Sequence, residues 1–231
     1  MKKIIYLGLL LSFLSSPALA ATNASSAIIR LYKAYMSTSG DCSSPEVFFD
    51  AASDPTTYPN GYAEVDMVNN PTIGSGSLTG GTYQCVIFKM SDQITFTAAD
   101  DEGAQCVQDQ TYTTDVCWNW NDNVVIKNPE TNEETLCTTM GEPAETIWVY
   151  ISTWSTLLTG SGCEDCDGFI PPTTDGDTKN GYKLTNAVDL GSNIIGTFVF
   201  GTDGKVVTEQ SGGLERCGLE TPDFSFRVEA Q

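Results

Sequence analysis

The stretch AIIRLYKAYM, residues 27–36, alternates apolar side chains with more polar ones. Successive side chains of an extended strand point to opposite faces, so this pattern places Ile29, Leu31 and Tyr35 on one face. We therefore predict a β-strand with one buried face. Because it follows closely on the expected start of the mature chain, it is either the first strand of its own sandwich, which we favour, or a strand that adds to the sheet of a neighbouring molecule.

Short segments of similar character recur along the rest of the chain. The 28 Thr residues and the aromatic residues favour strands, and turn-forming Gly, Asn, Asp and Pro recur between the segments. No long window shows an apolar stripe of helical period. We therefore predict an all-β chain, an antiparallel β-sandwich of about 8–10 strands with disulfide-pinned loop insertions. The further candidate strands are residues 61–68, 82–90, 93–98, 124–126, 146–154, 196–201, 205–209 and 224–229.

The strongest local signal lies near the end of the chain. Thr202-Asp203-Gly204 separates the segments 196–201 and 205–209. Asp-Gly is a preferred hairpin turn because Gly accepts a positive φ. We predict that these two segments pair as a β-hairpin.

Residues 1–20 have the three-part pattern of a secretory signal peptide. A basic start with Lys2 and Lys3 precedes the apolar residues 4–14, and small residues precede an expected cut after Ala20. The apolar run is shorter than the roughly 20 residues that a membrane span needs. We expect a bacterial protein that is exported to the periplasm, the medium or the cell surface, with residues 21–231 as a single domain and no membrane insertion after cleavage.

Eight cysteines lie in the mature chain, and an even number in an oxidising compartment favours disulfides. Cys163 and Cys166 are spaced like a redox pair or half of a zinc site, but the neighbouring Glu164 and Asp165 should raise the thiol pKa rather than lower it. We therefore interpret this pair as structural. We expect all eight to be paired: Cys42, Cys85, Cys106, Cys117, Cys137, Cys163, Cys166 and Cys217.

Charge and composition exclude several classes of function. The chain has 11 Lys and Arg, 30 Asp and Glu and no His, which gives a formal charge of −19. Without His, catalytic triads and imidazole zinc sites cannot form within this chain. Nucleic-acid binding depends on Lys and Arg that neutralise phosphates, so an acidic chain is not expected to bind nucleic acid.

Two segments are predicted to be insertions, and the acidic one suggests a metal site. Residues 103–143 form a cysteine-rich excursion and residues 160–182 an acidic loop. Carboxylates on a loop are suitable ligands for calcium. The candidate ligands are Asp175, Asp177 and Asn180, although Lys179 stands where a calcium loop would place an oxygen ligand. A solvated acidic loop without metal is the alternative that we favour.

Among the four Trp residues, Trp118 and Trp120 suggest a ligand platform. If this segment is extended, both indoles lie on one face with Asn119 and Asn121 beside them, an arrangement suited to stacking on sugar rings. The alternative is core packing, which the position of Trp118 directly after Cys117 favours.

No motif in the chain identifies a family. We interpret the protein as a non-enzymatic structural, adhesive or ligand-binding module, and a surface protein or a glycan is the partner class that this interpretation allows, with oligomers also allowed. The alternative is a secreted carboxylate-dependent hydrolase of the glycosidase type, which needs two suitably spaced carboxyl groups. No cofactor is expected apart from the calcium considered above.

The charge predicts a pH-dependent solubility. After loss of Lys2 and Lys3 with the signal peptide, nine basic and 30 acidic residues remain, a formal charge of −21. The protein should remain dispersed at pH 7 and associate as the pH falls toward its pI of about 4.1, because the repulsion between carboxylates disappears. Light scattering across this range tests the expectation, and salt-sensitive submicromolar binding to duplex DNA at neutral pH would contradict the charge argument.

Overall fold

The computed structural model confirms an all-β chain. It describes residues 21–69, 80–116, 124–137, 146–157, 168–190, 194–211, 214–220 and 223–230. Sixteen strands occupy these residues, and the one helical element among them is a 3-10 turn at Ala51–Ser53. The strands are more numerous than expected because six of them lie outside the predicted segments and the predicted segment 82–90 forms two strands.

The centre of the fold is the long strand β1 (Ala24–Ser37). Along one edge, β1 pairs antiparallel with β5 (Cys85–Ser91) and then with β6 (Gln93–Ala98). These two strands follow each other directly in the chain and are separated only at the buried Asp92, so together they accompany β1 over almost its whole length. The first candidate strand of the sequence is thus an internal strand of its own sheet.

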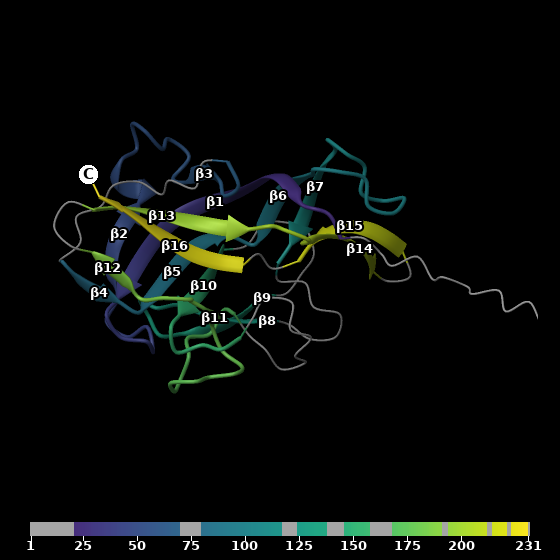
Figure 1. The fold of residues 1–231 in the computed structure, drawn as a ribbon. Helices are drawn as coiled ribbons and strands as arrows, with labels where there is room; N and C mark the ends of the chain where they lie inside the picture. Colours follow the sequence, from purple (N-terminus) through teal and green to yellow (C-terminus); the bar gives the residue numbers. More distant parts are fainter. Residues whose placement is uncertain are drawn as a thin grey trace, which may run out of the picture.

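Five further strands complete this eight-stranded sheet (Figure 1). The second edge of β1 pairs antiparallel with β2 (Glu46–Asp50) and β3 (Ala63–Asp66). Beyond β5 lies β10 (Thr146–Ser152), and beyond β6 lies β7 (Thr111–Asp115). β11 (Tyr182–Lys183) then pairs with β10 as the parallel member of an otherwise antiparallel sheet.

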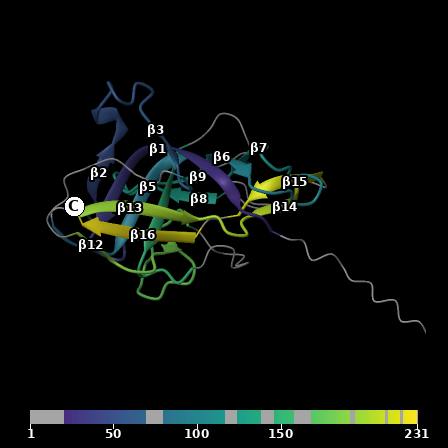
Figure 2. The same ribbon diagram turned by 45° about the horizontal axis from the view of Figure 1, so that its top comes forward.

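Smaller two-stranded ribbons pack around the main sheet. β13 (Ile194–Gly201) pairs with β16 (Asp223–Ala230), and this ribbon crosses in front of β1 and β5 as a second layer (Figures 1 and 2). The other ribbons, all antiparallel, are β4 (Gly81–Tyr83) with β12 (Val188–Leu190), β8 (Val124–Lys127) with β9 (Glu134–Cys137), and β14 (Val206–Ser211) with β15 (Leu214–Leu219). Sandwich-like layering therefore accompanies a main sheet that is strongly curled.

A β-bulge in β1 changes which side chains share a face. Leu31 pairs with Met90, and Lys33 pairs with the adjacent Lys89, so Tyr32 is an extra residue in β1. A bulge places two residues of one strand opposite one residue of its partner and shifts the alternation of side chains by one.

The prediction that Tyr35 shares a face with Ile29 and Leu31 is therefore wrong. Ile29 and Leu31 are buried in the main core, where Ala34 and Met36 join them beyond the bulge. Tyr35 is buried in a separate cluster on the opposite face. A single inserted residue accounts for this exchange of faces.

The predicted hairpin across Thr202-Asp203-Gly204 is also wrong. The turn itself forms, because the Lys205 N–H donates to the Thr202 carbonyl at 3.1 Å. However, the strand before the turn pairs with β16 and the strand after it pairs with β15.

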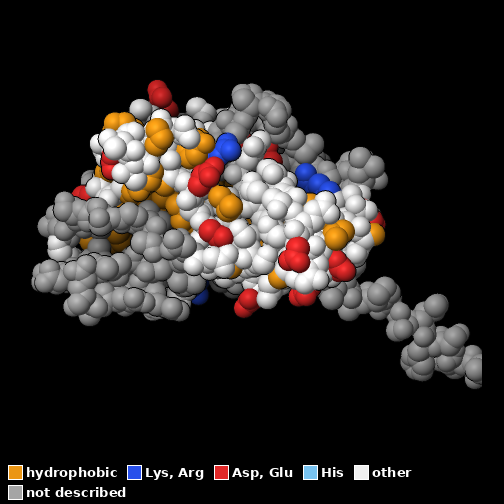
Figure 3. All heavy atoms as spheres, turned by 90° about the horizontal axis from the view of Figure 1, so that it is seen from above, with side chains coloured by type: hydrophobic (Ala, Val, Ile, Leu, Met, Phe, Trp, Pro, Cys, Tyr) orange, Lys and Arg blue, Asp and Glu red, His pale blue; other side chains and the backbone are white. Residues whose placement is uncertain are grey.

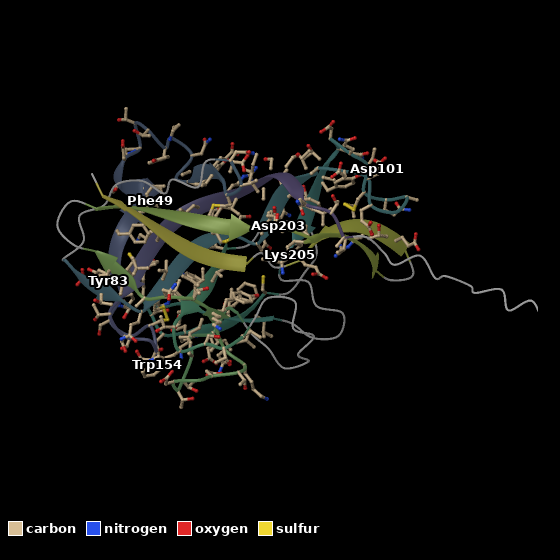
Figure 4. All side chains as sticks on the ribbon, in the orientation of Figure 1. Phe49, Tyr83, Asp101, Trp154, Asp203 and Lys205 are labelled. Atoms are coloured by element: carbon tan, nitrogen blue, oxygen red, sulfur yellow. A yellow bond between two sulfur atoms is a disulfide. The ribbon has the colours of Figure 1, made fainter. Side chains whose placement is uncertain are left out.

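The turn instead docks on the N-terminal segment. The Gly204 N–H donates to the side-chain oxygen of Asn23 at 2.8 Å. Thr22 and Val206 exchange backbone hydrogen bonds of 3.0 and 2.9 Å. These contacts, remote in sequence, replace the local strand pairing, and Figure 4 shows Asp203 and Lys205 close together at this junction.

Buried apolar side chains gather in three clusters. We call the largest the main core; it lies on one face of the main sheet and includes Leu31, Val86, Phe88, Ile147 and Ile151, each with no exposed surface. Full burial of such side chains stabilises the fold by about 1.5–3 kcal/mol each. The hairpin core joins β1, β6 and β14 through Ala24, Ala27, Phe96, Ala98, Cys106, Val206 and Cys217. The back cluster, on the other face of the main sheet, holds Tyr35, Cys42, Cys85, Ile87 and Tyr150.

Two disulfides lie inside these smaller clusters. Cys42–Cys85 joins the loop after β1 to β5, with a Cα–Cα distance of 5.3 Å. Cys106–Cys217 joins the loop after β6 to β15, with a Cα–Cα distance of 4.8 Å. Cys137 is disulfide-bonded as well, and no described cysteine is free. Each bridge links segments that are far apart in the chain.

Some predicted features lie outside the described residues or differ in detail. The expected signal peptide, residues 1–20, is not described. The segment 103–143, expected as an excursion, supplies β7 to the main sheet and also contains β8 and β9. Among the described residues, no helix is long and apolar enough to span a bilayer.

The second disulfide generates a stability prediction. Replacing Cys106 and Cys217 by Ser should lower the free energy of unfolding by about 2–4 kcal/mol, because the bridge closes a loop with a sequence separation of 111. Native-state hydrogen exchange should show the loss first at the Val206 amide, whereas the amides of β5 remain protected. Equal loss of protection in β5 and Val206 would contradict a bridge that acts locally on the hairpin core.

Candidate functional site

The structure does not test the predicted tryptophan platform. Trp118, Asn119, Trp120 and Asn121 lie in residues 117–123, outside the described residues, so that prediction stays open. Of the other two tryptophans, Trp154, labelled in Figure 4, packs directly on Gly40, where substitution of the glycine by a larger residue would make a side chain collide with the indole. Trp154 therefore has a packing role.

The predicted calcium ligands are arranged as a hydrogen-bonded turn. The Asp177 carboxylate accepts backbone N–H donors from Thr173, Lys179 and Asn180 at 2.8–3.0 Å. It also accepts the Thr173 hydroxyl at 3.2 Å and the Asn180 side-chain amide at 3.1 Å. Asp175 is exposed to solvent. Asp177 thus organises its own loop through five hydrogen bonds.

These hydrogen-bond donors determine the direction in which the pKa of Asp177 shifts. Burial alone would raise the pKa of its carboxyl group, but the hydrogen bonds from Thr173, Lys179 and Asn180 outweigh burial and lower the pKa to about 2. Within the described part of the chain, no group of three or more Cys, Asp and Glu side chains is arranged to hold a metal ion. The calcium site remains a prediction.

A polar cluster that the sequence did not predict lies on the face of the main sheet opposite the main core. Four strands contribute one row of directly paired residues: Asp50 on β2, Lys33 on β1, Lys89 on β5 and Trp148 on β10. The bulge at Tyr32 is what turns Lys33 toward this face. We call Lys33, Tyr35, Lys89, Trp148 and the Glu130 described below the lysine–tryptophan cluster.

Lys33 is held by two carboxylates. Its Nζ lies 3.3 Å from Asp50 Oδ2 and 2.9 Å from Glu130 Oε1. The Tyr35 hydroxyl donates to the same Glu130 oxygen at 2.9 Å. The Lys33 side chain is only 23% exposed, so this ion pair is better shielded from water than most surface pairs.

Glu130 reaches the sheet from the turn between β8 and β9. Asn128 shapes this turn, because its side chain accepts the Glu130 N–H at 2.9 Å and its carbonyl accepts the Asn132 N–H at 2.8 Å. The Tyr150 hydroxyl donates to the Lys127 carbonyl at 2.8 Å and fixes the base of the same turn. The β8–β9 turn is therefore anchored over the back cluster.

The charges in the lysine–tryptophan cluster stabilise one protonation state. The hydrogen bond from Lys33, followed by that from Tyr35, lowers the pKa of Glu130, and the contact with Glu130 raises the pKa of Lys33. Burial, followed by the bond to Glu130, raises the pKa of Tyr35. At neutral pH the cluster holds an ammonium, a carboxylate and a neutral phenol.

Two hydrogen-bond donors of the cluster have no acceptor among the described residues. Lys89 places its Nζ over the Trp148 ring, 5.5 Å from the ring centroid, and makes no ion pair with the described residues. The Trp148 indole N–H is buried and has no partner in hydrogen-bond geometry, although it lies near enough to Tyr35 to lower that residue's pKa. The cluster therefore has more donor groups than it can satisfy internally.

An aromatic group adjoins the cluster through Tyr32. The Tyr32 ring meets the Tyr62 ring edge to face at a centroid distance of 5.9 Å, and Arg30 lies 5.2 Å above the Tyr62 ring. Arg30 also approaches Glu64 at 3.7 Å. Elsewhere acidic side chains are scattered, as the view from above shows, with Lys and Arg at few points (Figure 3). Cations and aromatic rings thus occur together on β1 in an otherwise acidic protein.

The lysine–tryptophan cluster brings several hydrogen-bond donors and aromatic rings to one face of the main sheet. Ammonium, phenol and indole donors beside half-buried aromatic rings can bind an anionic or polar ligand. Sequence patterns missed the cluster because Lys33 and Lys89 are far apart in the chain and meet only through strand register.

Comparisons with protein-family models, with curated proteins and with solved structures found no significant match for this chain.

The Asp177 turn generates a pH-dependent prediction. The folded-state pKa of about 2 lies below the ordinary value of 3.8, so the ionised carboxylate stabilises the fold above pH 4, and this stabilisation is lost as the pH falls toward 2. Asp177→Asn should lower the free energy of unfolding by about 2 kcal/mol at pH 7 and by much less near pH 2. Urea unfolding at several pH values measures the difference.

The exposed neighbour Asp175 provides the matched control. Asp175→Asn should change stability little at either pH. Equal effects of both substitutions, or an Asp177 effect that does not depend on pH, would contradict the assigned role. A melting temperature that rises with added calcium, and does so only while Asp177 is intact, would instead support the calcium prediction.

Proposed function

We propose that this protein is a non-enzymatic module that works outside the cytoplasm, in a structural, adhesive or ligand-binding role. The observation that carries the proposal is the pair of disulfides, Cys42–Cys85 and Cys106–Cys217, within an all-β fold. Disulfides form and persist in oxidising compartments. Together with the expected signal peptide, they support a place in the periplasm, at the cell surface or in the medium.

The positions of the disulfides support a role in which durability matters. The half-cystines are buried in the back cluster and the hairpin core, where their relative exposure is 7% or less. Cys106–Cys217 links the β14–β15 ribbon to the loop after β6. Cys42–Cys85 links the loop after β1 to the main sheet. Both bridges therefore resist local opening at sites where a protease or a pulling force could start unfolding.

The ligand-binding form of the proposal rests on the lysine–tryptophan cluster. Lys89, which makes no ion pair with the described residues, and the adjoining Tyr32 and Tyr62 offer a cation and aromatic edges on one sheet face. A surface protein or a glycan is the partner class that we propose. Nucleic acid is not proposed, because the formal charge of −19 repels phosphate chains.

The hydrolase alternative has less support. Asp50 and Glu130 both contact the Lys33 ammonium, so they are the carboxylates that the structure brings together in the cluster. A glycosidase needs one carboxylic acid with a raised pKa as the proton donor. The pKa of Glu130 is instead lowered by Lys33. This pair is therefore better suited to holding a cation than to donating a proton.

The proposal predicts a protein without free thiols that depends on its bridges. Thiol titration of the denatured, unreduced protein isolated from its native host should find no reactive thiol, and reduction should lower stability by about 2–4 kcal/mol for each bridge. Two or more reactive thiols per chain would contradict the proposal.

A screen for turnover separates the proposal from the hydrolase alternative. The folded protein should release no product from a panel of polysaccharides. Product release that disappears in Glu130→Gln or Asp50→Asn, while Glu133→Gln retains it, would establish the alternative. Glu133 is a suitable control because it lies on the same turn and does not contact Lys33.

A further inference from the structure

Two donors of the lysine–tryptophan cluster bind the same carboxylate. Lys33 Nζ and the Tyr35 hydroxyl both bind Glu130 Oε1 at 2.9 Å. Lys89 lies close enough to act electrostatically on the same carboxylate. The buried Trp148 N–H lies beside Tyr35 and has no acceptor in hydrogen-bond geometry among the described residues. We call the four donor residues Lys33, Tyr35, Lys89 and Trp148 the cradle. The Glu130 carboxylate occupies the position beside the cradle on this face of the sheet.

Without an anion beside it, the cradle lowers the free energy of unfolding. Lys33 and Lys89 are directly opposite each other on antiparallel strands, a position in which like charges repel. Asp50 and Glu130 neutralise Lys33, but no carboxylate of the described residues lies within 4.0 Å of Lys89. A second carboxylate at Lys89 would relieve both the repulsion and the unsatisfied indole donor.

Glu130 and the cradle belong to different structural elements, a turn and the main sheet. Lys33, Tyr35, Lys89 and Trp148 lie on three adjacent strands of the main sheet, which fixes their positions. Glu130 is on an exposed turn, and its side chain is 42% exposed. A partly exposed side chain can rotate toward solvent while its turn stays anchored, whereas the residues of the central strands are held by their backbone pairing. Glu130 is therefore the member of the cluster that an external group can displace.

We propose that the lysine–tryptophan cluster is a carboxylate-binding site, filled by Glu130 in the free protein and open to the carboxylate of a uronic-acid sugar. This inference rests on the ligand-binding form of the proposed function. A sugar fits because Tyr32, Tyr62 and Trp148 supply aromatic surface beside the cations, and aromatic rings pack on the C–H groups of pyranose rings. A uronic acid carries one charge per ring, which limits the repulsion from the acidic protein.

The experiment follows the indole N–H resonance of Trp148 while trigalacturonate is added to the folded protein. Trp148→Phe identifies the resonance by its disappearance. In the wild-type protein, trigalacturonate should shift this resonance in a saturable manner, and its methyl ester, which lacks the charges, should not. Glu130→Gln should bind trigalacturonate about tenfold more tightly, because the internal competitor is removed. Glu133→Gln on the same turn should bind like the wild-type protein.

Substitutions at two lysines test whether binding depends on the positive charge of Lys89. Lys89→Gln should weaken binding by about tenfold or more, whereas the exposed Lys183→Gln should not change it. The same titration with wild-type protein and Lys89→Gln keeps the test valid if Glu130→Gln does not fold. Absence of a saturable shift, an equal shift with the methyl ester, or unchanged binding in Lys89→Gln would overturn the proposal.

A third arm uses a short peptide rich in glutamate. Tighter binding of this peptide than of trigalacturonate would overturn the assignment to a sugar and favour a protein partner. None of these outcomes affects the thiol titration or the turnover screen, so failure of this inference is distinguishable from failure of the proposed function.

Discussion

The strand β1 satisfies its backbone hydrogen bonds along both edges, with β5 and β6 on one side and β2 and β3 on the other. All other parts of the main sheet depend on this arrangement. β10 and β7 extend the sheet only because β5 and β6 are held beside β1, and the hairpin core forms where the start of β1 meets β6 and Val206. Since buried backbone groups must be paired, any shift of β1 would expose unsatisfied groups on both sides.

The bulge at Tyr32 then connects the fold to the candidate site. Without the extra residue, strict alternation would keep position 33 on the face of Ile29 and Leu31, inside the main core. With it, Ala34 and Met36 continue the core, and Lys33 and Tyr35 turn to the opposite face. There they meet Lys89 and Trp148 across the sheet and Glu130 from the β8–β9 turn. One local irregularity thus separates an apolar face from a face that can bind a charged group.

The sequence was informative wherever a segment carried its own signal. Alternation in residues 27–36, 93–98 and 146–154 predicted β1, β6 and β10, because each strand has one buried face. Thr111–Asp115 was missed since its mostly polar side chains show little alternation, although it pairs along the whole of β6. The bulge and the docking of the Asp203-Gly204 turn depend on contacts remote in sequence, as does the row from Asp50 to Trp148. The fold class was therefore predictable, and the register that builds the cluster was not.

Amide hydrogen exchange along β1 tests the central claim most directly. In a strand that pairs on both edges, successive N–H groups point to alternate edges and all of them are bonded. The account predicts slow exchange at consecutive amides from residue 26 to residue 36, interrupted only near the bulge at Tyr32. Fast exchange at every second amide would show that β1 lies at the edge of a sheet, and would contradict both the fold and the site built on it.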